Sequence, residues 1–147
     1  MNKILLVDDD QYKTSEIVSF LENTRPEYNI IIQTSINRGL RRLRIEQFDL
    51  VLLDMSLPTF NINDTENFKS FGGLDFLDEM KRKQIKTPTI IVTQYEVFGE
   101  GDSVKSSAQI SEECKIKYEN YKDIIIFSSS ENSWREKLLY LTGELLK

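Results

Sequence analysis

The chain has 147 residues, 39% of them hydrophobic and 29% charged, a balance that predicts a globular protein with a core of its own. Its formal charge of −5 argues against a nucleic-acid or anionic-membrane surface, because both of those partners are polyanions. The sequence contains no histidine, which excludes histidine-based triads, histidine-ligated zinc and a phosphohistidine relay on this chain. A single cysteine and the lack of any apolar run of about 20 residues predict a cytoplasmic protein without a membrane span.

Short apolar runs alternate along the chain with segments of helical periodicity. The runs predict strands buried on both faces, and in chain order they cover residues 4–7, 29–33, 49–53, 89–92 and 124–127. A segment with apolar residues at helical spacing follows each run and predicts a helix. In chain order, these predicted helices are residues 11–24, a helix with Ile36, Leu40 and Leu43 on one face, a helix that begins after Gly72 and Gly73, residues 104–121, and a helix with its inner face from Trp134 to Leu145.

This strict alternation of strand and helix predicts one α/β domain over residues 1–147. Right-handed crossovers between successive strands then require an open, doubly wound sheet with helices on both faces. We expect five parallel strands in the flavodoxin-like order 2-1-3-4-5.

Acidic or hydroxyl side chains directly follow three of the predicted strands. Asp8 and Asp9 follow the first strand, Asp54 the third and Thr93 the fourth. In the predicted order the first and third strands are neighbours, and ligands of such folds bind beyond the carboxyl ends of the strands where the strand order reverses. We therefore expect these side chains to meet in one shallow crevice, although a single aspartate after a strand is more often a turn or cap residue, as Asp10 or Thr14 is expected to be.

Three carboxylates in one crevice repel one another unless a cation offsets their charge. Mg²⁺ suits such a site, because it prefers one or two carboxylates together with waters and phosphate oxygens. An aspartate beside this ion can accept a phosphoryl group, since the transfer depends mostly on alignment and charge neutralisation. Asp54 is the predicted acceptor, and the hydroxyl of Thr93 could donate a hydrogen bond to a phosphoryl oxygen.

The same motifs resemble the receiver domain of response regulators in two-component signalling. KILLVDDD resembles the family's first strand with its acidic pair at Asp8 and Asp9, and DLVLLDMSLP resembles the third strand with its phospho-accepting aspartate at Asp54. TPTIIVTQ resembles the fourth strand with its switch hydroxyl at Thr93. The resemblance covers most of the chain and is strongest over residues 3–93.

This resemblance implies how the site is used. Mg²⁺ would be held by Asp9, Asp54 and the backbone carbonyl of Ser56, with Asp8 acting largely through water. A histidine kinase or another phosphodonor would supply the phosphoryl group, and the phosphorylated chain would contact a downstream protein partner, with a homodimer left open. The chain would be a signalling domain and not an enzyme, and it would bind neither nucleic acid nor membrane.

The end of the last predicted strand departs from the family pattern. The family places a lysine there, whereas the segment DIIIFSSSENSW contains none and brings Phe127 or Ser128 to that place. A hydroxyl can donate a hydrogen bond but cannot supply the charge of a lysine. Lys13 and Lys105 are the candidates to reach the site from elsewhere, and the aromatic residue that pairs with the switch hydroxyl is missing, because residues 124–126 are aliphatic.

Two further departures lie on the signalling side of the site. Residues 59–71 form a polar stretch longer than expected for the family, either a lid or partner-binding loop or a tolerated surface insertion. The region 94–121 is extended by the polar segment YEVFGEGDSVKSS, and Gln94 is bulkier than the small residue usual beside the switch hydroxyl, so it could restrict access to the site.

Two other functions remain as alternatives. An atypical pseudo-receiver would keep the fold and act as an interaction module without phosphorylation, which the missing lysine favours. A Mg²⁺-dependent phosphohydrolase would need a second catalytic aspartate two residues after Asp54, and Ser56 stands at that position, so this reading is disfavoured.

Overall fold

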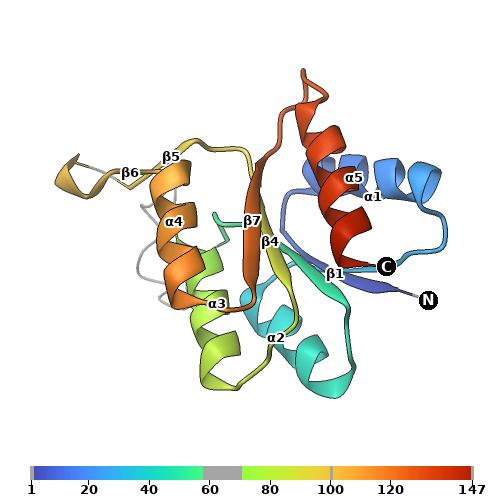
Figure 1. Ribbon diagram of the computed structural model, residues 1–147, viewed down its shortest axis with the longest axis horizontal. Helices are drawn as coiled ribbons and strands as arrows, with labels where there is room; N and C mark the ends of the chain where they lie inside the picture. Colours follow the sequence, from blue (N-terminus) through green and yellow to red (C-terminus); the bar gives the residue numbers. More distant parts are fainter. Residues whose placement is uncertain (1, 58–70, 100, 147) are drawn as a thin grey trace.

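A computed structural model describes residues 2–57, 71–99 and 101–146, and strands alternate in it with helices around a central sheet (Figure 1). In chain order the elements are β1 (Lys3–Val7), α1 (Gln11–Thr24), β2 (Asn29–Gln33), α2 (Ile36–Ile45), β3 (Leu50–Leu53), α3 (Gly72–Arg82), β4 (Thr89–Thr93), β5 (Val97–Phe98), a 3₁₀ turn (Gly101–Ser103), β6 (Lys105–Ser106), α4 (Ser107–Lys117), β7 (Tyr121–Ile126) and α5 (Ser133–Leu145). None of the described helices is both long and apolar enough to cross a bilayer.

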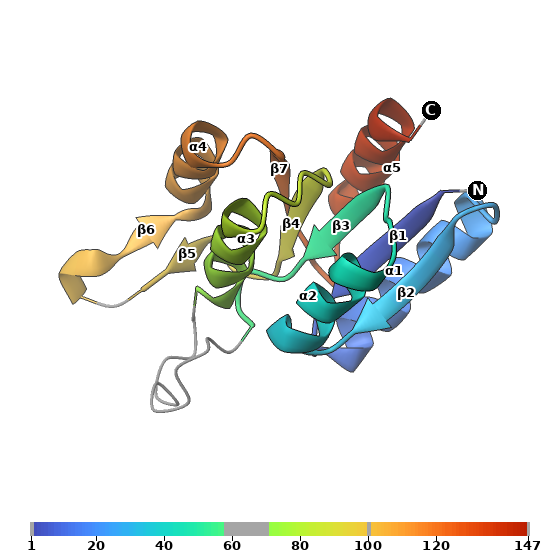
Figure 2. The same cartoon turned by 90° about the horizontal axis from the view of Figure 1, so that it is seen from below.

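The central sheet has five parallel strands in the order β2-β1-β3-β4-β7, which confirms the predicted fold and strand order. Helices α1 and α5 cover one face of this sheet, and α2, α3 and α4 cover the other (Figure 2). Strands β1 and β3 lie side by side in register, with Val7 opposite Leu53, so the residues that follow these two strands emerge next to each other.

Each face of the sheet has its own hydrophobic core, which explains why the strands read as continuous apolar runs. In β1, Ile4 and Leu6 belong to the core under α1 and α5, whereas Leu5 and Val7 belong to the core under α2, α3 and α4. All four side chains are at most 1% exposed. The site at the carboxyl ends of the strands therefore rests on elements packed from both sides.

The predicted helix over residues 104–121 is wrong at both ends. α4 starts later, where Ser106 and Gln109 form a capping box by exchanging side-chain to backbone hydrogen bonds. It ends at Lys117, because the next residue, Tyr118, has an extended backbone with a φ of −121° and a ψ of 113°, and Tyr121 already belongs to β7. Tyr118 and Tyr121 keep a helix-like spacing only because both side chains are buried in the same core.

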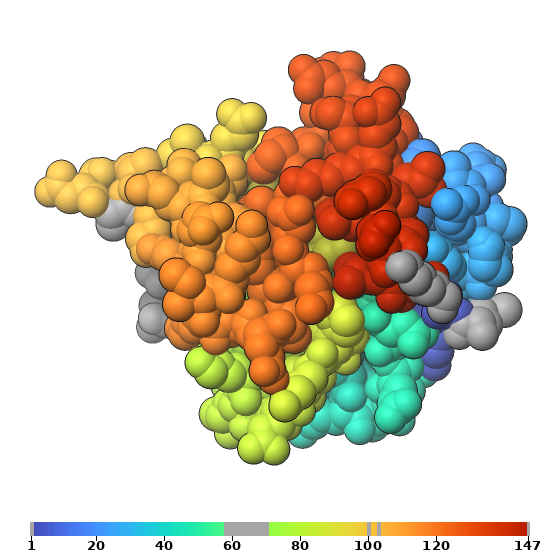
Figure 3. Space-filling view, in the orientation of Figure 1, coloured from blue at the N-terminus to red at the C-terminus, as the bar shows by residue number. Residues whose placement is uncertain are grey.

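The segment before α4 contains a hairpin that the sequence analysis did not predict. β5 and β6 pair antiparallel, with Val97 opposite Ser106 and Phe98 opposite Lys105, and the hairpin projects from the body of the protein (Figure 1, Figure 3). The side chain of Phe98 is wholly buried and anchors the hairpin to the core. The predicted insertion at residues 59–71 lies, except for its last residue, outside the described residues.

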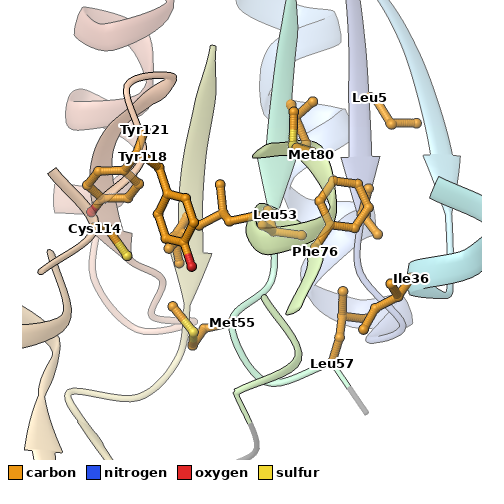
Figure 4. Packing of buried hydrophobic residues seen from close by; sticks show 14 of the residues in the cluster. Leu5, Ile36, Leu53, Met55, Leu57, Phe76, Met80, Cys114, Tyr118 and Tyr121 are labelled. Carbon is orange, nitrogen blue, oxygen red and sulfur yellow. The ribbon is translucent and has the colours of Figure 1, made fainter. Parts of the chain in front are cut away.

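The segment that follows β3 is fixed by alternate apolar residues and by two glycines. Met55 and Leu57 are wholly buried and point into the core beside Phe76 (Figure 4). A Cβ atom on Gly72 would lie 1.8 Å from the Leu57 carbonyl oxygen, so the start of α3 lies directly against this segment. The close approach of Gly72 and Gly73 therefore fixes the segment that directly follows Asp54.

Substitution of Gly72 tests this contact. Gly72→Ala should lower the free energy of unfolding by about 2 kcal/mol or more, because backbone and not a flexible side chain would have to move. Gly143→Ala is the matched control, since no atom lies within 4 Å of a Cβ at that position of α5, and it should stabilise the protein by about 1 kcal/mol. Urea denaturation measures both values, and equal effects of the two substitutions would contradict the close approach.

Candidate functional site

The carboxyl ends of β1 and β3 bring three aspartates together. One carboxylate oxygen each of Asp8, Asp9 and Asp54 lies within 4.8 Å of the others, as expected from the neighbouring strands. Asp8 and Asp54 are buried, and Asp9 is exposed. Oxygen ligands at this spacing form a group that could hold a hard divalent cation.

A small cavity of about 140 Å³ opens beside these carboxylates. Its walls come from the start of α1, the segment after β3 and the segment after β4, and they consist of Asp9, Asp10, Lys13, Asp54, Ser56, Gln94 and Tyr95. The predicted site residues Asp9, Asp54 and Ser56 therefore share one cavity. Gln94, which the sequence analysis expected beside the site, completes it together with Tyr95, which the sequence analysis did not assign to the site.

The central cation of the site is Lys13, whose side chain is 2% exposed. Its Nζ lies 2.7 Å from Asp8 Oδ2 and 3.2 Å from Asp54 Oδ1, and it donates to the Val92 carbonyl oxygen at 2.5 Å. Of the two lysines considered from the sequence, Lys13 reaches the site, while Lys105 pairs with Glu113 on the surface.

The start of α1 explains why Lys13 points into the site. Asp10 caps the helix, as predicted, and its side chain accepts a hydrogen bond from the backbone N–H of Lys13. A long side chain on a helix leans toward the N-terminus of that helix. Lys13 therefore leans back over the strand ends, and this rule was the sequence signal that could have assigned it to the site.

Burial is the dominant influence on Asp8. It raises the pKa of this carboxyl to about 6, with the Lys13 charge lowering it and the charge of Asp54 raising it further. Oδ1 accepts a hydrogen bond from the backbone N–H of Asp10 at 2.9 Å. Oδ2 is buried and has only the ion pair with Lys13, without hydrogen-bond geometry, so it remains an acceptor without a donor among the described residues.

Asp9 and Asp54 differ in their surroundings. The pKa of Asp9 is raised, first by desolvation of its carboxyl group and then by the nearby charge of Asp54. Oδ1 of Asp54 accepts hydrogen bonds from Lys13 Nζ and from the backbone N–H of Ser56, each at 3.2 Å. No donor from the described residues reaches Oδ2 of Asp54, so this oxygen is the one open to a reaction partner.

Thr93 is placed differently from the other predicted site residues. Its side chain is wholly buried and does not line the cavity, and its Oγ1 accepts a hydrogen bond from the backbone N–H of Tyr95 at 3.2 Å. The next residue, Gln94, reaches across the cavity instead and donates from Nε2 to Asp10 Oδ2 at 2.9 Å. The end of β4 is thus tied to the start of α1.

Phe127 directly follows β7, where the sequence placed Phe127 or Ser128 at the position of the family's lysine. Its backbone N–H donates to the carbonyl oxygen of Thr93, and its ring centroid lies 4.8 Å from that of Trp134 in the core under α1 and α5. Phe127 is therefore a packing residue, and the only basic side chain among the described residues that line the cavity comes from α1.

Comparison with known proteins agrees with these features. Residues 4–105 match the family model of the response regulator receiver domain. The chain belongs to this family. It is 31% identical over 149 aligned positions, which cover 97% of this chain and 99% of the relative, to the Detocs response regulatory protein DtcB of Enterobacter cloacae strain JD6301. The resemblance stated from the sequence motifs is confirmed.

Solved receiver structures have the same fold. The response regulator receiver domain protein (CheY-like) of Methanospirillum hungatei JF-1 aligns over 99% of this chain and 94% of its own, with a TM-score of 0.66 and 21% identity. A chain from the complex of the histidine kinase ThkA with the response regulator protein TrrA aligns over the full length of both chains, with a TM-score of 0.63 and 21% identity. Receiver domains are signalling domains that generally bind Mg²⁺ at an acidic pocket, and the aspartate cluster of this receiver lies at that place.

The raised pKa of Asp8 makes the stability of the metal-free receiver depend on pH. Because this pKa is about 6 in the folded chain against an ordinary value of 3.8, the stability that Asp8 contributes is present below about pH 4 and is lost as the pH rises through 6. Asp8→Asn removes this titration. The free energy of unfolding of D8N relative to wild type should therefore rise between pH 4 and pH 7.

Urea denaturation in the presence of a chelator measures this difference. Asp49→Asn serves as the control for loss of an aspartate away from the site, because Asp49 is exposed at the opposite end of β3, where its side chain accepts a hydrogen bond from the Lys3 backbone N–H. A D8N difference that stays constant over the same range would contradict the raised pKa.

Proposed function

We propose that the protein is a phospho-accepting receiver in which Asp54 takes the phosphoryl group. The proposal rests on how the two oxygens of the Asp54 carboxylate are bonded. Lys13 and Ser56 fix its Oδ1, while its Oδ2 has no described donor, and the carboxylate lines a cavity of about 140 Å³. A carboxylate oriented through one oxygen and open at the other is suited to attack phosphorus.

The transfer needs no oxidant or reductant. Oδ2 of Asp54 supplies the electron pair for a new oxygen–phosphorus bond, and the bond between phosphorus and the leaving nitrogen of a phosphohistidine, or the leaving oxygen of an acyl phosphate, breaks. The leaving atom keeps that electron pair, and a leaving nitrogen takes up a proton from water. The chain holds the acceptor oxygen in line, since Lys13 and the Ser56 N–H prevent rotation of the carboxylate.

The site fits Mg²⁺ in charge and in ligand type. Asp8, Asp9 and Asp54 supply three negative charges and Lys13 one positive charge, which leaves two for a divalent ion to offset. Oδ2 of Asp8 is buried and lies 2.7 Å from Lys13 Nζ without a hydrogen bond, so a water of the ion could donate to it. Asp9, Asp54 and the Ser56 carbonyl would hold the ion, with Asp8 acting largely through water. Mg²⁺ supplies neutralisation of the phosphoryl charge when it is bound.

The partners follow from the same proposal. The histidine kinase ThkA forms a complex with the response regulator TrrA, and a chain of that complex shares the fold of this receiver. We infer that a histidine kinase or a related phosphodonor phosphorylates this chain, which then acts on a downstream protein. A single domain over residues 1–147 and a cytoplasmic location belong to the proposal as well, with a homodimer left open.

Thr93 must reorient if it is to act as the switch hydroxyl. Its Oγ1 would exchange the hydrogen bond from the Tyr95 N–H for a contact with a phosphoryl oxygen. The buried position of Thr93 outside the cavity, together with the aromatic packing of Phe127, favours a second candidate. This candidate is a pseudo-receiver that acts as a phosphorylation-independent interaction module.

Phosphoryl-analogue binding separates the two candidates. With Mg²⁺ and beryllofluoride, the wild type should form a saturable complex visible in amide NMR shifts around residue 54. With Mg²⁺ and acetyl phosphate, intact-mass spectrometry should show one added phosphoryl group. Asp54→Asn should abolish both, because the amide is a poor nucleophile and lacks the carboxylate charge.

Asp49→Asn is the matched control, since Asp49 precedes β3 as Asp54 follows it and does not line the cavity. This variant should bind beryllofluoride and accept phosphate like the wild type. If the wild type forms neither the beryllofluoride complex nor the phosphorylated product, the phospho-acceptor proposal is wrong. The pseudo-receiver that acts as an interaction module would then be the remaining candidate.

A further inference from the structure

We propose that Lys13, which α1 supplies, binds the phosphoryl group in place of the lysine that the family carries after its last strand. The inference rests on the proposed function of Asp54 and adds a residue that the family pattern does not assign. It also predicts where the phosphorylated state is sensed, at the contact between α1 and the end of β4.

The position of the ammonium group is the first argument. Nζ of Lys13 lies 3.2 Å from Oδ1 of Asp54, so a phosphoryl group on Oδ2 of the same carboxylate would have its oxygens within reach of this ammonium. Lys13 also lines the cavity that the phosphoryl group would enter. No movement of a strand or helix is needed for the contact.

The second argument is that the described walls of the cavity offer no other cation. Lys13 is their one basic side chain, Phe127 packs on Trp134, and Lys105 is engaged with Glu113 on the surface. Bound phosphoryl oxygens are commonly met by a lysine or arginine, because charge-assisted hydrogen bonds are stronger than neutral ones. Among the described residues that line the cavity, Lys13 is therefore the side chain that can supply a positive charge to the phosphoryl oxygens.

The third argument is the change of charge when the site is loaded. Without a divalent ion, Lys13 is the buried cation between Asp8 and Asp54. A divalent ion near the same carboxylates repels the ammonium, and phosphorylation adds negative charge on the side of Asp54. Both changes favour a shift of the ammonium from Asp8 toward the phosphoryl oxygens.

This shift has a consequence for β4. Lys13 donates to the Val92 carbonyl oxygen, directly before Thr93, and Gln94 donates to the α1 cap Asp10. When the ammonium turns to the phosphoryl group, the Val92 carbonyl loses its donor. The end of β4 and the hairpin that follows would then respond to phosphorylation through α1, without a lysine after β7.

A purely structural role for Lys13 is the alternative, in which it only neutralises two buried carboxylates. The two roles differ in the direction of two affinities. A neutral residue at position 13 removes repulsion of Mg²⁺ and removes a partner of the phosphoryl analogue, so one affinity should rise while the other falls. A structural defect would weaken both together.

The experiment compares wild type, Lys13→Met and Lys105→Met. Mg²⁺ affinity is measured by NMR titration, and beryllofluoride affinity is measured at Mg²⁺ concentrations that saturate each protein. K13M should bind Mg²⁺ about tenfold more tightly, from the loss of a nearby like charge. It should bind beryllofluoride roughly 10- to 100-fold more weakly, as expected for a lost charge-assisted hydrogen bond. K105M should match the wild type in both.

The Val92 carbonyl carbon provides a further readout. Its chemical shift should change on beryllofluoride binding in the wild type and remain nearly constant in K13M. Since K13M leaves two buried carboxylates unpaired and could fail to fold, the same comparison is made between D8N and the D8N/K13M double variant, where the ammonium and one carboxylate are removed together.

The outcomes distinguish this inference from the proposed function. Two results would overturn the role of Lys13 and leave Asp54 as the acceptor, provided that the wild type binds beryllofluoride. In the first, K13M binds beryllofluoride as tightly as the wild type. In the second, K13M loses affinity for both Mg²⁺ and beryllofluoride. The same result on the D8N background would have the same meaning. Wild type that does not bind beryllofluoride at all would overturn both.

Discussion

The ammonium group of Lys13 is the interaction on which the site depends. It joins three segments that are distant in sequence, because it contacts Asp8 after β1, Asp54 after β3 and the carbonyl of Val92 in β4. Removing one partner from a buried ion pair typically costs about 3–5 kcal/mol, since the remaining charge is left without compensation. In the metal-free chain, the protein's own cation therefore holds the carboxylates of Asp8 and Asp54 close together.

The scaffold around this cation is rigid for reasons that the sheet explains. β1 and β3 are packed from both faces by separate cores, and the start of α3 lies against the segment after β3 so closely that Gly72 has no room for a side chain. Side chains at the ends of such strands are held more precisely than side chains on free loops. At the end of β4, the hydrogen bond from Gln94 to Asp10 and the bond from Lys13 to the Val92 carbonyl tie the strand to α1. Under the proposed function, a change of charge at Asp54 would reach β4 through these two contacts.

Much of this architecture could be predicted from the sequence. Apolar runs of four or five residues identified the strands of the sheet, since strands covered on both faces have no polar side, and the right-handed crossover fixed their order. The position of the aspartates at neighbouring strand ends followed from that order.

The β5–β6 hairpin could not be predicted, because two-residue strands carry no periodicity, and the ends of α4 depended on the cap at Ser106 and on extended backbone at Tyr118. The direction of Lys13 depended on one side-chain conformation, and the inward turn of Thr93 on a hydrogen bond to the Tyr95 backbone.

The position of Lys13 on α1, and not after the last strand, bears on which parts of the sequence can change in evolution. Every described residue that lines the cavity lies at or before Tyr95, within the first two-thirds of the chain. In a receiver whose lysine follows the last strand, the C-terminal part must conserve that residue for chemistry while its surface adapts to a partner. Here the end of β7 contributes packing, as the contact of Phe127 with Trp134 shows. Under the proposed role of Lys13, changes in the last third of the chain could alter partner contacts while the residues that line the cavity stay intact.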